Sequence, residues 1–579
     1  MNVSEQLLDI LAQEGVKQIF GVAGDALNPL VSAIGKREDI SWIRVNHEEN
    51  GAYAAFAQGE LTGNFGVCAS TVGPGALHLI NGLYNAKKER SPVIAITGQI
   101  PVEHLGTNYH QEVDLEKIYD DVCEYQAIIR SPEEAPRVIL RAIRIAINES
   151  AVCRIELPAD IAAMPAANTD FVHQVFRSKS VMVPPKEQLK QIAQVLNEAT
   201  TVGILAGAGC RNAKAEVLEL AKRLKAPITH SLRASDIFDH QTPQVVGLSG
   251  LIGNPSGYQA VMDSEVLLML GTDFPYTKFL PENTKTIQID VRAENIGNRT
   301  SVDYGLHADL KSAATALIPL INPKQEDDFL RKLEDQFQRW LEDRRNEADA
   351  ERDLEPLHPQ IFTQQISDQA SDDAIFVIET GAAAIWASNF MSFHGERRMI
   401  GSFNHGSMGV GLPGAIGAQF AYPEREVWAI VGDGAFNMTL QDFMTAVTYE
   451  LPIKILVLNN SQLGFVKIEM EEAGLMPNLD ALKVNNFDFA AFSELCGGKG
   501  IKVAHAKDIA GAIAQAKASK GPFVINAIVN SGELALPPKI GWEEASGFGL
   551  SKAKEVIAAL SGNKSQWQNL KKEVEAFFD

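Results

Sequence analysis

Asp433 and Asn460 are the residues whose types and spacing point most directly to chemistry. Asp433 follows an apolar run, residues 427–431, within a Gly-Asp-Gly turn, and Asn460 follows a second apolar run, residues 453–458. If these runs are neighbouring strands of a parallel sheet, both end at one edge and the two side chains face each other. A carboxylate, an amide oxygen and loop carbonyls make the oxygen-rich site that Mg²⁺ prefers, with room for phosphate oxygens. The glycines let backbone NH groups approach a diphosphate.

The Gly-Asp-Gly turn at Asp433, followed by Asn459-Asn460, resembles the coenzyme motif of thiamine diphosphate enzymes such as pyruvate oxidase, acetolactate synthase and pyruvate decarboxylase. Alone, a Gly-Asp-Gly sequence would indicate only a common turn. The second apolar run and its asparagine at this spacing favour the coenzyme site. The resemblance implies that Asp433, Asn460 and the backbone carbonyl of Gln462 bind Mg²⁺.

Glu48 is the candidate acid. A strand-like run, residues 42–45, leads into it, and a helix rich in small residues that can pack tightly follows. A carboxyl group that is partly removed from water there favours its protonated form. By its place after His47, Glu48 is similar to the catalytic glutamate of the family, whose carboxyl promotes the coenzyme tautomer that removes the C2 proton. The alternative is an acid that only complements a helix dipole, which we keep for Glu49.

Two further segments of the first 180 residues resemble parts of the coenzyme pocket. The Gly-Pro-Gly sequence that begins at Gly73 is similar to a segment that lines the pocket, although a plain turn into a helix is the alternative. Gln111 lies in a segment similar to the Phe-Gln-Glu sequence that reaches the site from the neighbouring subunit, and it can donate to a substrate carboxylate. His110 departs from that pattern; we interpret it as an aromatic-sized wall, with a proton shuttle as the alternative. His78 is interpreted as structural.

Met408, Phe465 and Glu469 are the candidates nearest the reacting carbon. Met408 matches the bulky apolar residue that bends the coenzyme in this family; core filling is the alternative. Acetolactate synthases carry methionine and tryptophan at the positions of Phe465 and Glu469, so these residues favour a pyruvate-oxidising enzyme, with catalytic roles in electron transfer and protonation. The alternative, a surface loop with solvated acids, is kept for Glu471 and Glu472. The resemblance implies further coenzyme contacts from Gly73, Gly381, Gly406, Ser407, Gly434, Ala435, Leu463 and Gly464.

The middle of the chain is a candidate flavin site. Gly207 and Gly209 follow an apolar run, but Asn212 replaces the third glycine of a dinucleotide fingerprint, which excludes an ordinary NAD site. Instead, several strand-end segments resemble the FAD-binding segments of pyruvate oxidases and pyruvate:quinone oxidoreductases. Glycine-rich strand ends admit a pyrophosphate, Asp290 can accept from sugar hydroxyls, and Arg233 can counter the phosphate charge. The FAD candidates are Gly207, Gly209, Arg233, Ser249, Gly250, Leu251, Ile252, Gly271, Thr272, Asp273, Phe274, Pro275, Tyr276 and Asp290.

The elements that position these residues form a regular pattern. Helical stretches alternate with short apolar runs, which predicts α/β domains built on doubly wound parallel sheets. The 579 residues exceed one hydrophobic core, and the rhythm of the first block returns after residue 350. We predict three such domains and a tail: pyrimidine-binding 1–182, central FAD-binding 183–335, diphosphate- and Mg²⁺-binding 336–530, and C-terminal 531–579.

Composition limits the partners and the compartment. A net charge of −21 without a basic run argues against nucleic-acid binding. Five dispersed cysteines predict buried thiols in a reducing compartment. Without a basic leader or a long apolar run, the protein is expected to be cytoplasmic. In quinone-reducing relatives a C-terminal segment attaches to the membrane surface; here packing of residues 567–578 on the protein body is preferred.

The resemblance covers almost the whole chain and implies oxidative decarboxylation of pyruvate. A thiamine-bound hydroxyethyl intermediate would pass electrons to FAD and then to oxygen or a quinone, giving CO₂ and acetate or, with phosphate, acetyl phosphate. The first alternative is an acetolactate synthase, which joins two pyruvates and keeps FAD out of the redox chemistry. A non-catalytic protein on the same fold would be expected to lack Glu48, Asp433 or Asn460, and all are present.

Assembly follows from the same resemblance. Glu48 and the metal motif lie in different predicted domains, which in this family meet across a subunit interface. A homodimer is therefore the minimum unit expected, and a homotetramer is favoured.

Overall fold

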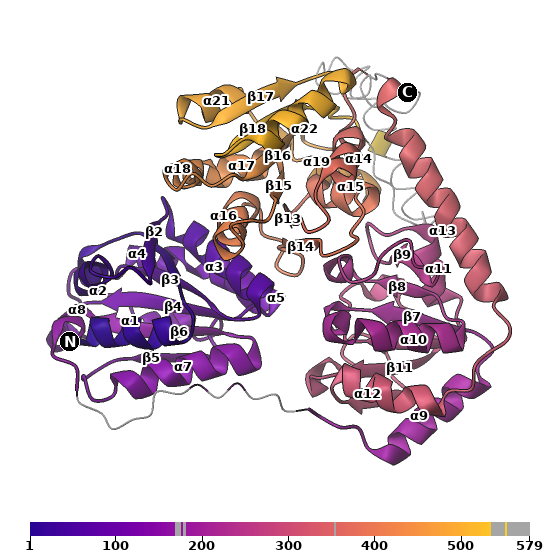
Figure 1. The fold of residues 1–579 in the computed structure, drawn as a ribbon, viewed down its shortest axis with the longest axis horizontal. Coiled ribbons are helices and arrows are strands. Elements are labelled where there is room, and N and C mark those ends of the chain that lie inside the picture. Colours follow the sequence, from indigo (N-terminus) through magenta and orange to yellow (C-terminus); the bar gives the residue numbers. More distant parts are fainter. Residues whose placement is uncertain (168–174, 176, 178–180, 353–354, 534–550, 553–579) are drawn as a thin grey trace.

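The computed structural model describes residues 1–167, 175, 177, 181–352, 355–533 and 551–552. Three lobes are visible in Figure 1, and each contains a six-stranded sheet. Every strand pair in these sheets is parallel, and helices cover their faces, which confirms the predicted fold class. The tail predicted for 531–579 lies almost entirely outside the described residues.

The first sheet has the strand order β2-β1-β3-β4-β6-β5. Its β3 and β4 are buried along their whole length, as expected of strands covered on both faces. The strands are β1 Gln18–Gly21, β2 Ser41–Arg44, β3 Gly66–Ser70, β4 Val93–Gln99, β5 Tyr125–Ile128 and β6 Val152–Pro158. The helices are α1 Val3–Gln13, α2 Asn28–Ile34, α3 Glu48–Thr62, α4 Pro74–His78, α5 Ile80–Glu89, α6 Leu115–Tyr119, α7 Ala135–Glu149 and α8 Ala159–Ala163.

The second sheet has the order β12-β11-β10-β7-β8-β9. The chain direction across the sheet reverses between β7 and β10, and crevices at such reversals are where open α/β sheets bind ligands. The strands are β7 Val202–Ala206, β8 Ile228–His230, β9 Val245–Leu248, β10 Val266–Leu270, β11 Lys285–Asp290 and β12 Tyr304–His307. The main helices are α9 Lys186–Glu198, α10 Lys214–Leu224, α11 Pro255–Met262 and α12 Leu310–Leu317.

The third sheet, β14-β13-β15-β16-β18-β17, repeats the relative order of the first, so the prediction of two similar α/β domains is confirmed. The strands are β13 Ile375–Ile378, β14 Arg398–Gly401, β15 Val427–Gly432, β16 Lys454–Asn459, β17 Lys499–Val503 and β18 Phe523–Ile528. The helices are α14 Pro359–Gln369, α15 Ala382–Phe390, α16 Gly411–Ala421, α17 Asp433–Thr439, α18 Phe443–Thr448, α19 Gly464–Glu472, α20 Leu479–Leu482, α21 Phe489–Leu495 and α22 Ile509–Ala518.

The long helix α13, Asp328–Glu347, runs along one side of the molecule between the second and third sheets (Figure 1). Its apolar seam includes Leu333 and Phe337, which are buried in a cluster with Val246 and Ala260. The helix is therefore packed on the second domain along this seam, while its charged side faces solvent.

Helices α3 and α16 join the first and third domains. Small residues of both helices, including Ala54 and Ala415, belong to one buried cluster. The approach is so close that a Cβ on Gly417 would lie 2.2 Å from the carbonyl oxygen of Ala54. The tight packing expected from the small residues of this helix is confirmed, and it fixes the helix that begins at Glu48 against the helix that follows Met408.

The predicted compartment depended on the cysteines and on the lack of a long apolar segment. All five cysteines are free thiols, and burial raises the pKa of Cys68, Cys153 and Cys210. Within the described ranges, no helix combines the length and the apolar character that crossing a membrane requires.

Candidate active site

Asp433 and Asn460 lie at the ends of neighbouring parallel strands, as predicted. In the register of β15 and β16, Gly432 is opposite Leu458. The Asp433 carboxylate is buried; its Oδ2 accepts from the backbone NH of Ser461 at 2.7 Å. Asn460 Oδ1 accepts from the backbone NH of Gln462 at 3.1 Å. The candidate Mg²⁺ ligands therefore belong to one connected edge of the third sheet.

Asn486 is a member of this edge that the sequence analysis missed. Its Nδ2 donates to Asp433 Oδ2 at 2.6 Å and to Asn459 Oδ1 at 2.7 Å. Its Oδ1 accepts from Asn437 Nδ2 at 3.1 Å. Burial raises the pKa of Asp433, whereas these donors oppose that rise. A bound cation would favour the ionised carboxylate, which suits a metal ligand.

Open space lies in front of three glycines at this edge. A Cβ built on Gly381, Gly406 or Gly432 would meet no atom within 4 Å. Gly381 and Gly406 also have positive φ angles, +105° and +71°, a region that favours glycine. Together with the oxygen ligands next to Gly432, this cradle fits a diphosphate with its metal ion.

Met408 and Leu463 meet above the start of α17. A Cβ on Gly434 would lie 2.9 Å from Leu463 Cδ2 and 3.5 Å from Met408 Cε. Met408 thus reaches the motif helix, and its coenzyme-bending role stays a prediction. A Cβ on Gly464 would lie 2.9 Å from Asn460 Nδ2, so this position allows little more than glycine.

Ala435 and Ser407, two other predicted coenzyme contacts of the third domain, have different surroundings. The backbone and side chain of Ala435 are buried inside α17. The Ser407 hydroxyl pairs with Tyr53 Oη at 2.6 Å and accepts from Asn81 Nδ2 at 2.9 Å. Ser407 therefore ties the loop of Met408 to the first domain of the same chain.

Glu48, Gly73 and Gln111 gather in the first domain. Glu48 is buried at the start of α3, and its Oε2 lies 2.9 Å from Nδ1 of His78. A Cβ on Gly73, where φ is +63°, would lie 2.7 Å from the carbonyl oxygen of Gln111. His78 was expected to be structural; its exposed ring is paired with the candidate acid.

Glu48 and Gln111 belong to the first domain, whereas Asp433 and Asn460 belong to the third. In the part of the chain that the structure describes, no hydrogen bond or ion pair joins Glu48 or Gln111 to Asp433 or Asn460. Instead, the residues beside Glu48 contact Asp442, which accepts from the backbone NH of Asn46 at 2.8 Å. A single chain therefore presents the candidate acid and the candidate metal site separately.

The predicted flavin segments lie at the carboxyl ends of the second sheet. Gly207 and Gly271 end β7 and β10 at the reversal point, and a Cβ on Gly207 would lie 2.2 Å from Gly271 O. A Cβ on Gly209 would lie 2.8 Å from Gly271 Cα, so both glycines serve the close approach of two loops. The Ser249 hydroxyl is buried and has no partner among the described residues, which leaves it for a ligand.

The remaining flavin candidates vary in exposure. Gly250 has a φ of +113°, and a Cβ there would lie 3.2 Å from the ring of Phe274. Asp290 Oδ1 accepts from Arg292 N at 2.9 Å and Asn295 Nδ2 at 3.1 Å. Thr272 and Phe274 are buried, Leu251 and Ile252 are half-buried, Pro275 and Tyr276 are exposed, and Asp273 pairs with Arg299 at 3.0 Å.

Arg233 is engaged elsewhere. Its guanidinium pairs with Glu60 at 3.0 Å and with Glu89 at 3.3 Å, both in the first domain. The prediction that Arg233 counters a flavin phosphate is not supported by these contacts, since two carboxylates already neutralise the guanidinium. The arginine joins the second domain to the first.

Helix α19 connects the coenzyme edge with the flavin segments. Phe465 packs against the same core cluster as Ile252 of the second domain. Burial and the charge of the exposed Glu469 raise the pKa of Tyr276. The two predicted cofactor regions therefore converge at this helix. Glu471 was expected to be solvated, but it is fully buried and pairs with Lys552 at 2.8 Å.

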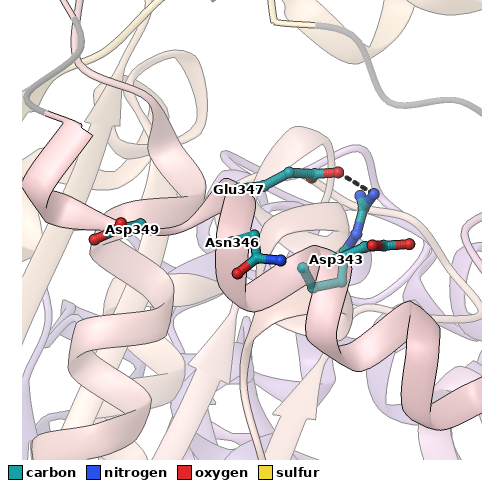
Figure 2. Close-up of a pocket in the computed structure, with 5 residues that line it drawn as sticks. Asp343, Asn346, Glu347 and Asp349 are labelled. Atoms are coloured by element: carbon teal, nitrogen blue, oxygen red, sulfur yellow. Dashed lines mark hydrogen bonds and ion pairs between the residues drawn. The ribbon is translucent and has the colours of Figure 1, made fainter.

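A separate polar cavity lies at the C-terminal end of α13. Figure 2 shows this cavity of about 500 Å³, with an ion pair between Arg344 and Glu347 on its wall. No residue predicted to bind a cofactor lines it. Its lining residues are Asp343, Arg344, Asn346, Glu347 and Asp349.

Comparison with known families decides what the edge of the third sheet is. Residues 1–118 match the N-terminal TPP binding domain of thiamine pyrophosphate enzymes, residues 189–317 their central domain, and residues 379–527 their C-terminal TPP binding domain. A Bacillus subtilis protein, YdaP, named as thiamine pyrophosphate-containing, is 36% identical over 576 residues, or 99% of each chain. The chain belongs to the thiamine pyrophosphate enzyme family.

Other relatives of this thiamine pyrophosphate-dependent enzyme differ in their reactions. A pyruvate oxidase of Lactiplantibacillus plantarum is 29% identical over 545 residues, covering 92% of this chain and 89% of the relative. An acetolactate synthase of Arthrospira platensis is also 29% identical, over 566 residues, covering 92% of this chain and 94% of the relative. Overall identity does not separate the two reactions, so the choice depends on individual residues.

Proposed function

We propose that this enzyme oxidatively decarboxylates pyruvate with thiamine diphosphate, Mg²⁺ and FAD. Electrons would pass to oxygen or a quinone, and the products would be CO₂ and acetate or, with phosphate, acetyl phosphate. The observation that carries the proposal is the convergence at α19. Phe465 and Glu469, which differ from the residues of acetolactate synthases, lie where the flavin-like segments of the second domain meet the coenzyme edge.

The third domain supplies the coenzyme anchor. Asp433, Asn460 and the carbonyl of Gln462 would hold Mg²⁺, and the open cradle at Gly381 would take the diphosphate. Met408 would support the bent coenzyme. Bound thiamine diphosphate supplies a nucleophilic carbon that stabilises the negative charge released by decarboxylation.

The first domain supplies the acid and a substrate contact. Glu48, buried at the start of α3, would hold the proton that the coenzyme ring needs. Gln111 would donate to the carboxylate of pyruvate, a local attraction that a chain of net charge −21 requires. Glu469, exposed at the edge of the site, would protonate or hydrogen-bond the reacting group.

The second domain would hold FAD at the reversal between β7 and β10. The unpaired Ser249 hydroxyl and the positive φ of Gly250 fit a ligand at the neighbouring strand ends. Bound FAD would accept the electrons of the oxidation. Burial raises the pKa of Tyr276 in this region, and Glu469 is close enough for its carboxylate charge to add to that rise. Ile252 and Phe465 pack against one core cluster.

A second copy of the chain would complete the site. The separate halves within one chain support at least a homodimer, and we favour a homotetramer. Leu77 and Tyr109 near the acid are exposed, at 40% and 47%, as are Met438 and Met444 after the metal motif, at 57% and 43%. These apolar side chains would be covered when the first domain of one copy meets the third domain of another.

An anaerobic reduction experiment tests the proposal. The enzyme, loaded with thiamine diphosphate, Mg²⁺ and FAD, is mixed with pyruvate without oxygen, and flavin absorbance, CO₂ and acetolactate are measured. We expect the absorbance of oxidised flavin to be lost as CO₂ forms. Acetolactate formation without flavin bleaching would identify an acetolactate synthase instead, a candidate that the equal identity to such an enzyme keeps open.

A further inference from the structure

The Glu48 carboxyl has a single side-chain partner. Its side chain is 9% exposed, and His78 Nδ1 at 2.9 Å is its only hydrogen-bond or ion-pair partner among the described residues. The other oxygen, Oε1, faces Gly75, where a Cβ would lie 2.9 Å away. The lack of a side chain at Gly75 thus leaves room for Oε1, while His78 pairs with the other oxygen.

The imidazole of His78 is itself held in place. It is the last residue of α4, and its ring stacks on that of His47, with centroids 4.5 Å apart and planes 26° apart. His47 is the N-cap of α3, and its Nδ1 accepts from the backbone NH of Glu49 at 3.3 Å. Because Nδ1 accepts this hydrogen bond, the His47 ring is anchored by the backbone. It therefore offers a fixed face on which the His78 ring stacks.

We propose that His78 is a positioning residue for Glu48, holding Oε2 so that Oε1 points to the coenzyme ring. This inference rests on the proposed role of Glu48. The potential ligand atoms of His47, Glu48 and His78 lie within 4.8 Å of one another, so the pair and its support form one unit at the start of α3. Losing the imidazole leaves a buried carboxyl without a partner, free to rotate away from the ring.

Deuterium exchange at C2 of bound thiamine diphosphate tests the pair, because this step needs the acid and neither pyruvate nor flavin. We expect His78→Ala to slow the exchange by about 10- to 100-fold, the usual effect of losing a residue that orients a functional group. His78→Asn should restore much of the rate, because its amide nitrogen can replace Nδ1. His394→Ala, at a half-exposed histidine beside Asp372, is the control and should exchange like the wild type.

A double variant separates positioning from general damage. In a Glu48→Gln background, already slow, His78→Ala should cause no further loss; a merely structural effect would add to it. A second measurement uses the coenzyme-free protein labelled with ¹⁵N-histidine, in which Glu48→Gln should shift the His78 imidazole resonances. Wild-type exchange in His78→Ala, additive losses, or unshifted resonances would overturn the inference. Wild-type exchange in Glu48→Gln alone would instead refute the proposed function of Glu48.

Discussion

Phe465 and Glu469 are the two residues on which the proposed choice of reaction rests. Both lie on α19, one packed against the core cluster that also receives Ile252, the other close enough to Tyr276 to affect its ionisation. Acetolactate synthases are expected to carry methionine and tryptophan at these two positions, where this chain has Phe465 and Glu469. We therefore propose that the side chains of α19 help to decide which groups surround the reacting carbon.

Replacing both residues tests this assignment. For Phe465→Met with Glu469→Trp, we expect anaerobic flavin bleaching by pyruvate to slow at least about tenfold while acetolactate formation rises, since the pocket then favours a second pyruvate. The ratio of the two rates is the measurement. Leu495→Met with Glu494→Trp introduces the same residues on exposed α21 and should leave the ratio unchanged. A ratio equal to that of the wild type in the α19 variant would contradict the assignment.

We predict that His230 and His240 make the second domain sensitive to acid. Their Nε2 atoms lie 3.2 Å apart, and burial lowers the pKa of both rings. The unfolded chain, with a histidine pKa of about 6.5, binds more protons than the folded protein below that pH. The contribution of these two rings to the free energy of unfolding is therefore fully present above about pH 6.5. It is lost as the pH falls towards the lowered pKa values of the folded state.

Thermal unfolding measures this loss. Between pH 7.5 and 5.5 we expect about 1.4 kcal/mol of lost stability for each ring. His230→Gln with His240→Gln should lower the midpoint at pH 7.5 but flatten its decline towards pH 5.5. His307→Gln, at an exposed edge position, should keep the wild-type decline. A double variant that declines as steeply as the wild type would show that other groups cause the acid sensitivity.

The candidate site could be predicted only where chemistry is encoded locally. Asp433 and Asn460 follow apolar runs at a spacing that a strand-helix-strand unit explains, and the structure places them directly after the ends of neighbouring strands. Asn486 reaches the same edge from a loop that carries no motif, and its contacts join residues 27 and 53 positions away. The contact between His78 and Glu48 likewise joins residues that are far apart in the sequence, 30 positions. Such pairs depend on the packing of elements, which periodicity does not encode.

At the scale of elements, the central strands were predicted and most edge strands were not. The runs 427–431 and 453–458 coincide with β15 and β16, which are buried over almost their whole length. The strands at sheet edges have one neighbour and shorter or less apolar sequences; β5 is half-buried along its length, and β17 begins exposed. The unpredicted strands were β5, β9, β12, β14 and β17, all at sheet edges, and the interior β18.

The packing of α3 on α16 gives a prediction at this scale. Gly417→Ala would place a methyl group 2.2 Å from Ala54 O, so the helices must separate. We expect a loss of about 1–3 kcal/mol, measured by thermal unfolding, and weaker binding of thiamine diphosphate, because both helices lead to site residues. Gly511→Ala in α22 is the control: a Cβ there meets nothing within 4 Å, and a gain of about 0.5–1 kcal/mol is expected. Equal stability of the two variants would contradict the close packing.

At the scale of the whole molecule, ion pairs fix the three domains of one chain. Arg233 links the second domain to Glu60 and Glu89 of the first, and Asp236 links it to Arg398 of the third at 2.9 Å. This arrangement holds the flavin-like segments beside α19. We propose that a second copy joins Glu48 to Asp433, because no hydrogen bond or ion pair links them among the described residues of one chain.

Mixed oligomers of Glu48→Gln and Asp433→Ala chains test whether the site forms between two copies of the chain. Co-expression with two affinity tags yields molecules that contain both chains, and deuterium exchange at C2 of bound thiamine diphosphate is measured. If the site forms between copies, Glu48 of the Asp433→Ala chain meets Asp433 of the Glu48→Gln chain, and half of the sites should bind coenzyme that exchanges at the wild-type rate. If mixed oligomers exchange no faster than the Glu48→Gln oligomer, the two halves do not meet between copies, and the account is contradicted.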